Sequence, residues 1–105
     1  MSTGLFGFSK QPSEKFYVAG EFRKVLEYGE TLVLASCTVA AEDKDAADMG
    51  TTVLDQATKA VDGTQLKIRC QAGAENKSPY KITFLATTSN GNVWEVDVEM
   101  EIEET

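Results

Sequence analysis

Residues 80–102, YKITFLATTSNGNVWEVDVEMEI, predict a β-hairpin. Two strands, Tyr80–Thr88 and Val93–Ile102, flank the polar connection Ser89–Asn92. In the second strand apolar residues alternate with acids: Trp94, Val96, Val98, Met100 and Ile102 against Glu95, Asp97, Glu99, Glu101 and Glu103. Because successive side chains of a strand point to opposite faces, one face must be buried and the other must meet water or a partner.

The composition limits the class of protein. The chain has 105 residues, enough for one domain, and a net charge of −7. A negative surface repels phosphate backbones, so we expect no nucleic-acid partner. No apolar stretch is long enough to span a membrane, and Met1–Lys10 lacks the basic and apolar regions of a secretory signal. We therefore expect no membrane partner, and synthesis in the cytoplasm, where thiols stay reduced.

Catalytic signatures are missing from the sequence. The chain has no histidine, which removes the usual general base and the commonest metal ligand. It also has no glycine-rich phosphate loop and no cysteine–histidine metal pattern. We therefore predict that the protein is not an enzyme and uses no cofactor or metal. The acidic loop 41–50 lacks the spacing of an EF-hand; it is interpreted as a solvated loop, with calcium binding left open.

Turn signals divide the rest of the chain into short strands. Residues 1–11 are interpreted as a flexible arm and residues 12–105 as one domain. Before the hairpin, strands are expected at 15–20, 31–40, 51–54, 56–61 and 65–70, whereas 21–28 fits either a helical turn or an irregular strand. The pattern predicts an all-β fold, a single antiparallel β-sandwich of about seven strands with Greek-key connections.

The two cysteines and one tyrosine receive structural roles. Cys37 and Cys70 fall on inward positions of expected strands, as buried free thiols do. If the strands are lettered as in an immunoglobulin domain, Cys37 lies on B and Cys70 on E, whereas the immunoglobulin disulfide joins B to F. We predict two free thiols. Tyr80 lies two residues before the central position of strand F and matches a tyrosine corner, whose hydroxyl bonds an upstream backbone group.

Two segments are candidates for interaction. The arm carries Leu5, Phe6 and Phe8, which could order on contact with a partner; a disordered tail, or a strand packed on its own sandwich, is the alternative. Trp94 is interpreted as a core residue at the start of the last strand, with a role as an interface anchor left open. The acidic strand face is interpreted as a solvated surface rather than a catalytic one, and it could also dock a basic partner.

The order and spacing of several short segments make this sequence resemble a family of small proteins from tailed-phage and prophage gene clusters. The resemblance runs from about Lys10 to Glu103 and includes KQPSEK at 10–15, GETL at 29–32, LASCTV at 34–39, QAG at 71–73 and YKITF at 80–84. Two segments depart from the family pattern. The loop at 74–77 has fewer glycines, and 41–55 is longer and more acidic. The resemblance implies an immunoglobulin-like sandwich with a structural or accessory role in the virion, and it carries no catalytic residues.

We therefore predict a phage or prophage structural protein, a head or tail accessory module that acts through protein–protein contacts. Its partners would be other virion proteins, with self-association left open, and it would assemble in the bacterial cytoplasm. A carbohydrate-binding or adhesin-like surface module is the alternative. That module would need export and would use Tyr17, Tyr28 and Trp94 as exposed aromatics.

Overall fold

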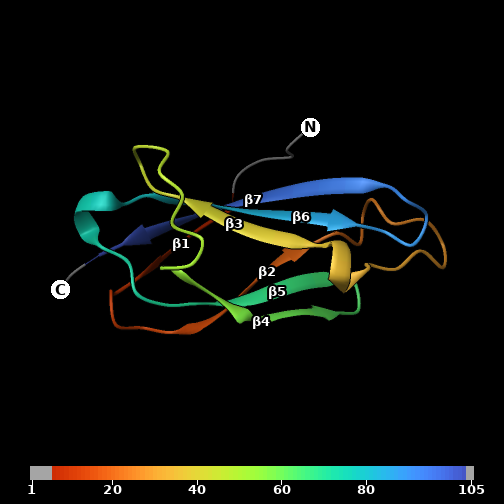
Figure 1. The fold of residues 1–105 in the computed structure, drawn as a ribbon, viewed down its shortest axis with the longest axis horizontal. Coiled ribbons are helices and arrows are strands. Elements are labelled where there is room, and N and C mark those ends of the chain that lie inside the picture. The colour runs from red at the N-terminus through yellow and green to blue at the C-terminus, as the bar shows by residue number, and fades with distance from the viewer. Residues whose placement is uncertain (1–5, 104–105) are drawn as a thin grey trace.

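The computed structural model describes residues 6–103, which fold into seven strands and two single 3₁₀ turns (Figure 1). The elements in chain order are β1 (Phe6–Lys10), β2 (Phe16–Glu21), η1 (Leu34–Ser36), β3 (Thr38–Glu42), β4 (Leu54–Asp62), β5 (Gln65–Cys70), η2 (Glu75–Lys77), β6 (Tyr80–Thr87) and β7 (Val93–Ile102). No helix within this range is long and apolar enough to cross a membrane.

The strands form two sheets that pack face to face. One sheet has the order β1-β7-β6-β3 and the other β2-β5-β4, and the two hairpins are β4–β5 and β6–β7. The other connections cross between the sheets. This arrangement confirms the predicted all-β sandwich of about seven strands. The orders β2-β5-β4 and β3-β6-β7 correspond to B-E-D and C-F-G of an immunoglobulin constant domain. One pairing departs from the antiparallel prediction, because β1 runs parallel to β7.

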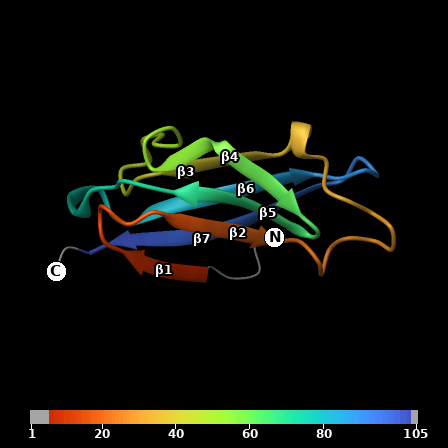
Figure 2. The same ribbon diagram turned by 90° about the horizontal axis from the view of Figure 1, so that it is seen from below.

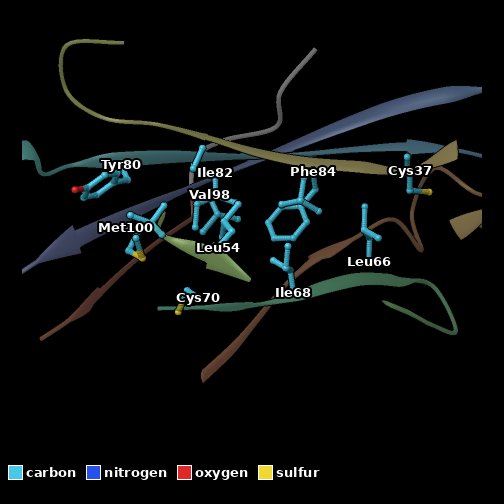
Figure 3. Close-up of a cluster of buried hydrophobic side chains, with 14 of the residues drawn as sticks. Cys37, Leu54, Leu66, Ile68, Cys70, Tyr80, Ile82, Phe84, Val98 and Met100 are labelled. Atoms are coloured by element: carbon cyan, nitrogen blue, oxygen red, sulfur yellow. The ribbon is translucent and has the colours of Figure 1, made fainter. Parts of the chain in front are cut away.

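The core lies between the two sheets and is supplied by alternate strand positions (Figure 3). β6 contributes Tyr80, Ile82, Phe84 and Ala86, and β5 contributes Leu66, Ile68 and Cys70; each is at most 1% exposed. On β7 the inward residues Val98, Met100 and Ile102 are buried. The period of two that predicted the hairpin therefore also identified the side of it that is buried.

Three expected strands differ from the observed ones. The segment 31–40 was expected as one strand, but Ser36 N bonds Val33 O and Cys37 N bonds Leu34 O, which closes the turn η1. The strand starts afterwards, at Thr38. Both alternate positions of 32–35 are apolar, so the sequence marks no clear buried face there. Two short strands were expected at 51–54 and 56–61. Residues 51–53 form a turn instead, and Leu54–Asp62 form one strand, β4, with an irregularity between Asp55 and Ala60.

The segment 1–11, expected as a flexible arm, contains a strand within its described part. Residues 6–10 pair with Val98–Ile102 of β7, as in the alternative of a strand on its own sandwich. Lys10 is 2% exposed, and its Nζ donates to Gln11 O, Pro12 O and Ala72 O at 2.7, 3.1 and 2.7 Å. Burial lowers the pKa of Lys10. A buried lysine held by three carbonyls is a tertiary arrangement that local sequence does not indicate.

Candidate interaction surfaces

Figure 1 shows the 22–33 loop, η1 and the β6–β7 hairpin together at one end of the sandwich, and these three segments carry exposed apolar side chains. We call this surface the apolar end. It contains six of the eight large apolar residues that are exposed among those described: Tyr28, Val33, Leu34, Leu85, Val93 and Trp94. Leu85 and Val93 lie on the outer face of their sheet, and the hairpin reaches beyond the β4–β5 turn.

Hydrogen bonds hold the loop of the apolar end against the hairpin. Val33 N donates to Thr87 O at 2.9 Å, and Ser89 N donates to Thr31 O at 2.8 Å. Glu30 is 7% exposed, and its carboxylate accepts from Glu27 N at 2.8 Å, from the Thr88 hydroxyl and from Asn92 Nδ2 at 2.9 Å. The Glu27 amide, followed by the Thr88 hydroxyl, lowers the pKa of the Glu30 carboxyl. The apolar side chains are thus displayed on an ordered base.

The four residues proposed from sequence for interaction have different positions. Leu5 lies outside the described residues, as does the side chain of Phe6. Phe8 is partly buried against the core, and its ring meets Phe16 edge to face at 5.6 Å. Trp94 is 37% exposed, although the sequence favoured a core position. It has the inward phase of β7, but it pairs with Ala86 at the tip of the hairpin, where the sandwich ends.

The acidic face of β7 is open along most of its length. Glu95, Glu101 and Glu103 are exposed, and Asp97 and Glu99 are half-buried. Among the described residues the one ion pair joins Lys67 to Asp62, on the opposite sheet, so these five carboxylates have no cationic partner within 4.0 Å. All five follow a single strand, without the enclosed cleft in which paired carboxylates acquire different pKa values.

Tyr80, assigned to a tyrosine corner from sequence, is 1% exposed. Its hydroxyl oxygen accepts a hydrogen bond from Ala74 N at 3.0 Å, which ties β6 to the loop that precedes it. Gly73 in this loop has φ +114°, and a Cβ there would lie 2.7 Å from Ile102 Cδ1, so only glycine fits. The geometry gives Tyr80 a structural position, and Figure 3 shows it at the other end of the core from Cys37, which directly follows η1.

Both cysteines are free and buried, at opposite ends of the core (Figure 3). Cys37 Sγ donates to Val33 O at 3.1 Å and Cys70 Sγ to Phe16 O at 3.2 Å. Burial raises the pKa of the Cys70 thiol. Cys37 was expected on strand B, but β2 occupies the place of that strand. Cys37 directly precedes β3, which occupies the place of strand C. With β5 in the place of E, neither cysteine is on strand F.

The acidic loop has a compact backbone structure. Asp43 is 6% exposed, and its Oδ1 accepts from Asp45 N at 2.9 Å and from Ala47 N at 3.0 Å. The described residues contain no group of three or more metal-ligating side chains. The Asp43 carboxylate therefore shapes the turn by bonding its own backbone, as aspartate does in many turns.

The three aromatics that a carbohydrate platform would need do not share one surface. Tyr17 lies on the outer face of the β2-β5-β4 sheet, between Lys67 and Arg69, whose charged groups are 5.4 and 5.3 Å from its ring. Trp94 lies on the other sheet and Tyr28 in a loop. This separation removes the structural argument for the carbohydrate-binding alternative.

One family model matches residues 10–101, which is most of the chain; its description is "Podophage GP4 fiber-tail adaptor protein gp77". The chain belongs to this family. It is therefore a structural protein of a tailed-phage virion, and the resemblance noted from sequence is confirmed. A search of curated proteins gives no match.

Membership of the Gp77 family directs attention to surfaces, and the sequence reasoning missed most of the apolar end. Tyr28 was considered only for the carbohydrate-binding alternative, and no contact role was given to Val33, Leu34, Leu85 and Val93. Two of them carry a signal in the sequence. Leu85 and Val93 are large apolar residues in the outward phase of strands whose other outward residues are polar. Apolar residues in an outward phase are a recognised mark of a contact surface.

Proposed function

We propose that this protein is an adaptor that joins a tail fibre to the tail of a podophage. The observation that carries the proposal is the match of residues 10–101 to the fibre-tail adaptor family. An adaptor works by protein–protein contact and needs no catalytic group, which agrees with a chain that lacks histidine. Its partners are other virion proteins rather than nucleic acid or membrane, and assembly takes place in the bacterial cytoplasm.

We assign the apolar end to one of the adaptor's contacts. Tyr28 is fully exposed, and Trp94 and Val93 are 37% and 57% exposed on an ordered base. Tryptophan and tyrosine are the residue types that most often anchor protein interfaces. Exposed apolar side chains are unfavourable in water, and a partner that covers them gains roughly 25 cal/mol for each Å² of apolar area buried. This physical cost favours a covered surface in the assembled virion.

A complementation experiment tests the adaptor role. Phage lacking this gene is grown in cells that supply the wild-type chain or a variant, and tails and fibres are quantified in purified particles by electron microscopy and mass spectrometry. We expect particles without the chain to have tails that lack a fibre, and the wild-type chain to restore it. Equal fibre content with and without the chain would disprove the adaptor function.

Two matched variants test the apolar end. Val93→Glu places a charge in the apolar end, and Ala40→Glu places one on the exposed outer face of β3 in the same sheet. Because both positions are exposed strand positions, both variants should fold. We expect Val93→Glu to reduce fibre attachment at least roughly tenfold, a loss of about 1.4 kcal/mol, and Ala40→Glu to complement like wild type. Equal complementation by both variants would remove the apolar end from the interface.

A further inference from the structure

The strand β1 is an edge strand, and its free side is defined by one hydrogen bond. Glu103 N donates to Lys10 O at 2.9 Å, so the backbone of Lys10 faces β7. Alternation along the strand gives Phe8 the same direction. The N–H and C=O groups of Gly7 and Ser9 therefore point away from β7. Figure 2 shows β1 at the rim of the sandwich, beside β7 of its own sheet and beyond β2 of the other sheet.

The opposite edge of the same sheet is closed by side chains and backbone from the following segments. Three carbonyl oxygens point outward from the edge of β3. They belong to Cys37, which precedes the strand, and to Val39 and Ala41 of the strand. They accept from Lys59 Nζ at 2.6 Å, Gln56 Nε2 at 2.8 Å and Met49 N at 2.8 Å. Proteins cover or charge their sheet edges because an open edge templates another strand. Within residues 6–103 the edge of β1 carries no such cover: Gly7 has no side chain, and the Ser9 hydroxyl turns back to Glu103 at 3.2 Å.

An incompletely covered pair of aromatic rings lies beside this open edge. Phe8 of β1 and Phe16 of β2 meet edge to face at 5.6 Å, across the gap between the two sheets. Phe8 is only partly buried, and Phe16 is 37% exposed. A strand added along β1 would direct every second side chain toward this pair. Apolar residues at those positions would complete the covering of both rings.

The other face beside the edge is acidic. Gly7 is in register with Glu99 and Ser9 with Glu101, so both carboxylates share a face with the smallest side chains of β1. Neither carboxylate has an ion pair among the residues described. A strand added along β1 would direct its remaining side chains over Gly7 and Ser9, toward these charges. Lysine or arginine at those positions would be favoured electrostatically.

We propose that the edge of β1 binds an extended segment of a partner virion protein, which adds as a strand and carries alternating apolar and basic residues. Backbone hydrogen bonds to Gly7 and Ser9 provide affinity, and the Phe8–Phe16 pair on one face and Glu99 and Glu101 on the other provide specificity. This inference rests on the adaptor function and adds a second contact, separate from the apolar end. A second copy of the chain fits less well, because β1 itself has no basic residue in the outward phase.

A synthetic peptide, Lys-Val-Lys-Val-Lys-Val-Lys, tests the edge directly. The probe is added to the full chain, and binding is measured by calorimetry and by amide hydrogen exchange. We expect slower exchange at Gly7 and Ser9, and no binding of a peptide with the same composition in block order. Protection at the β2 or β4 edge instead of β1 would overturn the proposal.

Two proline variants form the first matched pair. Ser9→Pro removes an N–H that points away from β7, a position that tolerates proline in edge strands. Ala19→Pro does the same on β2, since the bond from Phe22 N to Thr64 O (3.0 Å) sets an alternation in which Ala19 N–H points away from β5. We expect Ser9→Pro to weaken peptide binding at least roughly tenfold, and Ala19→Pro to leave it unchanged. Equal binding by the two folded variants would overturn the proposal.

Charge reversal gives a second test that leaves the backbone of β1 intact. The test variant is Glu101→Lys, because Glu101 is in register with Ser9. The control is Glu95→Lys, because Glu95 lies on the same face of β7 but beside Leu85. We expect Glu101→Lys to weaken binding several-fold and Glu95→Lys to leave it near wild type, with the difference reduced at high salt. Equal effects of the two reversals would contradict the proposed register, as would a β1-dependent dimer that excludes the peptide.

The complementation experiment separates this proposal from the adaptor function. If the wild-type chain restores fibres and Ser9→Pro restores them as well as Ala19→Pro does, the adaptor function stands and the edge proposal fails. If the wild-type chain does not affect fibre content, the adaptor function fails whatever the peptide does.

Discussion

At the scale of single residues, Tyr80 shows how a sequence motif becomes a specific contact. The ring is 1% exposed in the core, while its hydroxyl reaches the backbone of Ala74, six residues earlier. The loop can approach so closely because Gly73, which directly precedes Ala74, has a φ that other residues rarely adopt. One side chain thus links the core to the loop that enters β6.

Tyr80→Phe removes the hydroxyl and leaves the Ala74 N–H without this partner. We expect the free energy of unfolding to fall by about 1 kcal/mol, or somewhat more because the site is buried. Chemical denaturation measures the change. Tyr17→Phe, at a side chain 48% exposed on the outer face of the other sheet, is the control. If the two variants lose the same stability, Tyr80 has no role as a corner.

At the scale of elements, the β6–β7 hairpin and the loop before η1 depend on Glu30. Its carboxylate accepts three hydrogen bonds, two of them from Thr88 and Asn92 at the hairpin turn. These bonds favour the charged form, so the pKa of Glu30 is lower in the folded chain than in the unfolded one. The stability that Glu30 contributes is therefore present above roughly pH 4, the pKa range of an unfolded glutamate, and is lost as the pH falls through the folded pKa.

Glu30→Gln should lower stability at neutral pH and reduce its loss in acid. We expect the difference in unfolding free energy between wild type and Glu30→Gln to be largest near pH 7 and to shrink as the pH is lowered through the folded pKa. Denaturant unfolding at a series of pH values measures it. Glu95→Gln, on the exposed face of β7, controls for the removal of one carboxylate. If the difference in unfolding free energy did not change with pH, the charge of the Glu30 carboxylate would not contribute to stability.

The elements also show which parts of the fold are readable from sequence. The hairpin was predicted because its two faces differ at every position, from Trp94 to Ile102. The turn within 31–37 was not predicted, because Leu32, Val33, Leu34 and Ala35 would make both faces of a strand apolar. For β1 the sequence left a self-packed strand only as an alternative to a flexible arm, because the stability of this strand is tertiary. It depends on pairing with β7, 92 residues away in the chain, and on the carbonyl oxygens around Lys10. The apolar end likewise forms from three segments that only the fold brings together.

At the scale of the whole molecule, the two sheets are held close together at one glycine. Gly20 of β2 faces Phe84 of β6 across the core, and a Cβ built on Gly20 would lie 2.8 Å from Phe84 Cγ and 2.9 Å from Phe84 Cβ. Phe84 is fully buried, so it cannot move away without disturbing its neighbours. The absence of a side chain at Gly20 therefore allows β2 and β6 to approach closely at this point.

Gly20→Ala should destabilise the sandwich by about 1–3 kcal/mol, because the added methyl group overpacks the core. Gly7→Ala is the matched control in the other edge strand: its Cβ would lie 3.7 Å from Glu99 O, an ordinary contact. We expect Gly7→Ala to change the unfolding free energy by no more than roughly 0.5 kcal/mol. Thermal and denaturant unfolding of both variants measure the two effects. If Gly20→Ala were as stable as Gly7→Ala, the close approach of the sheets at Gly20 would not limit the packing of the core.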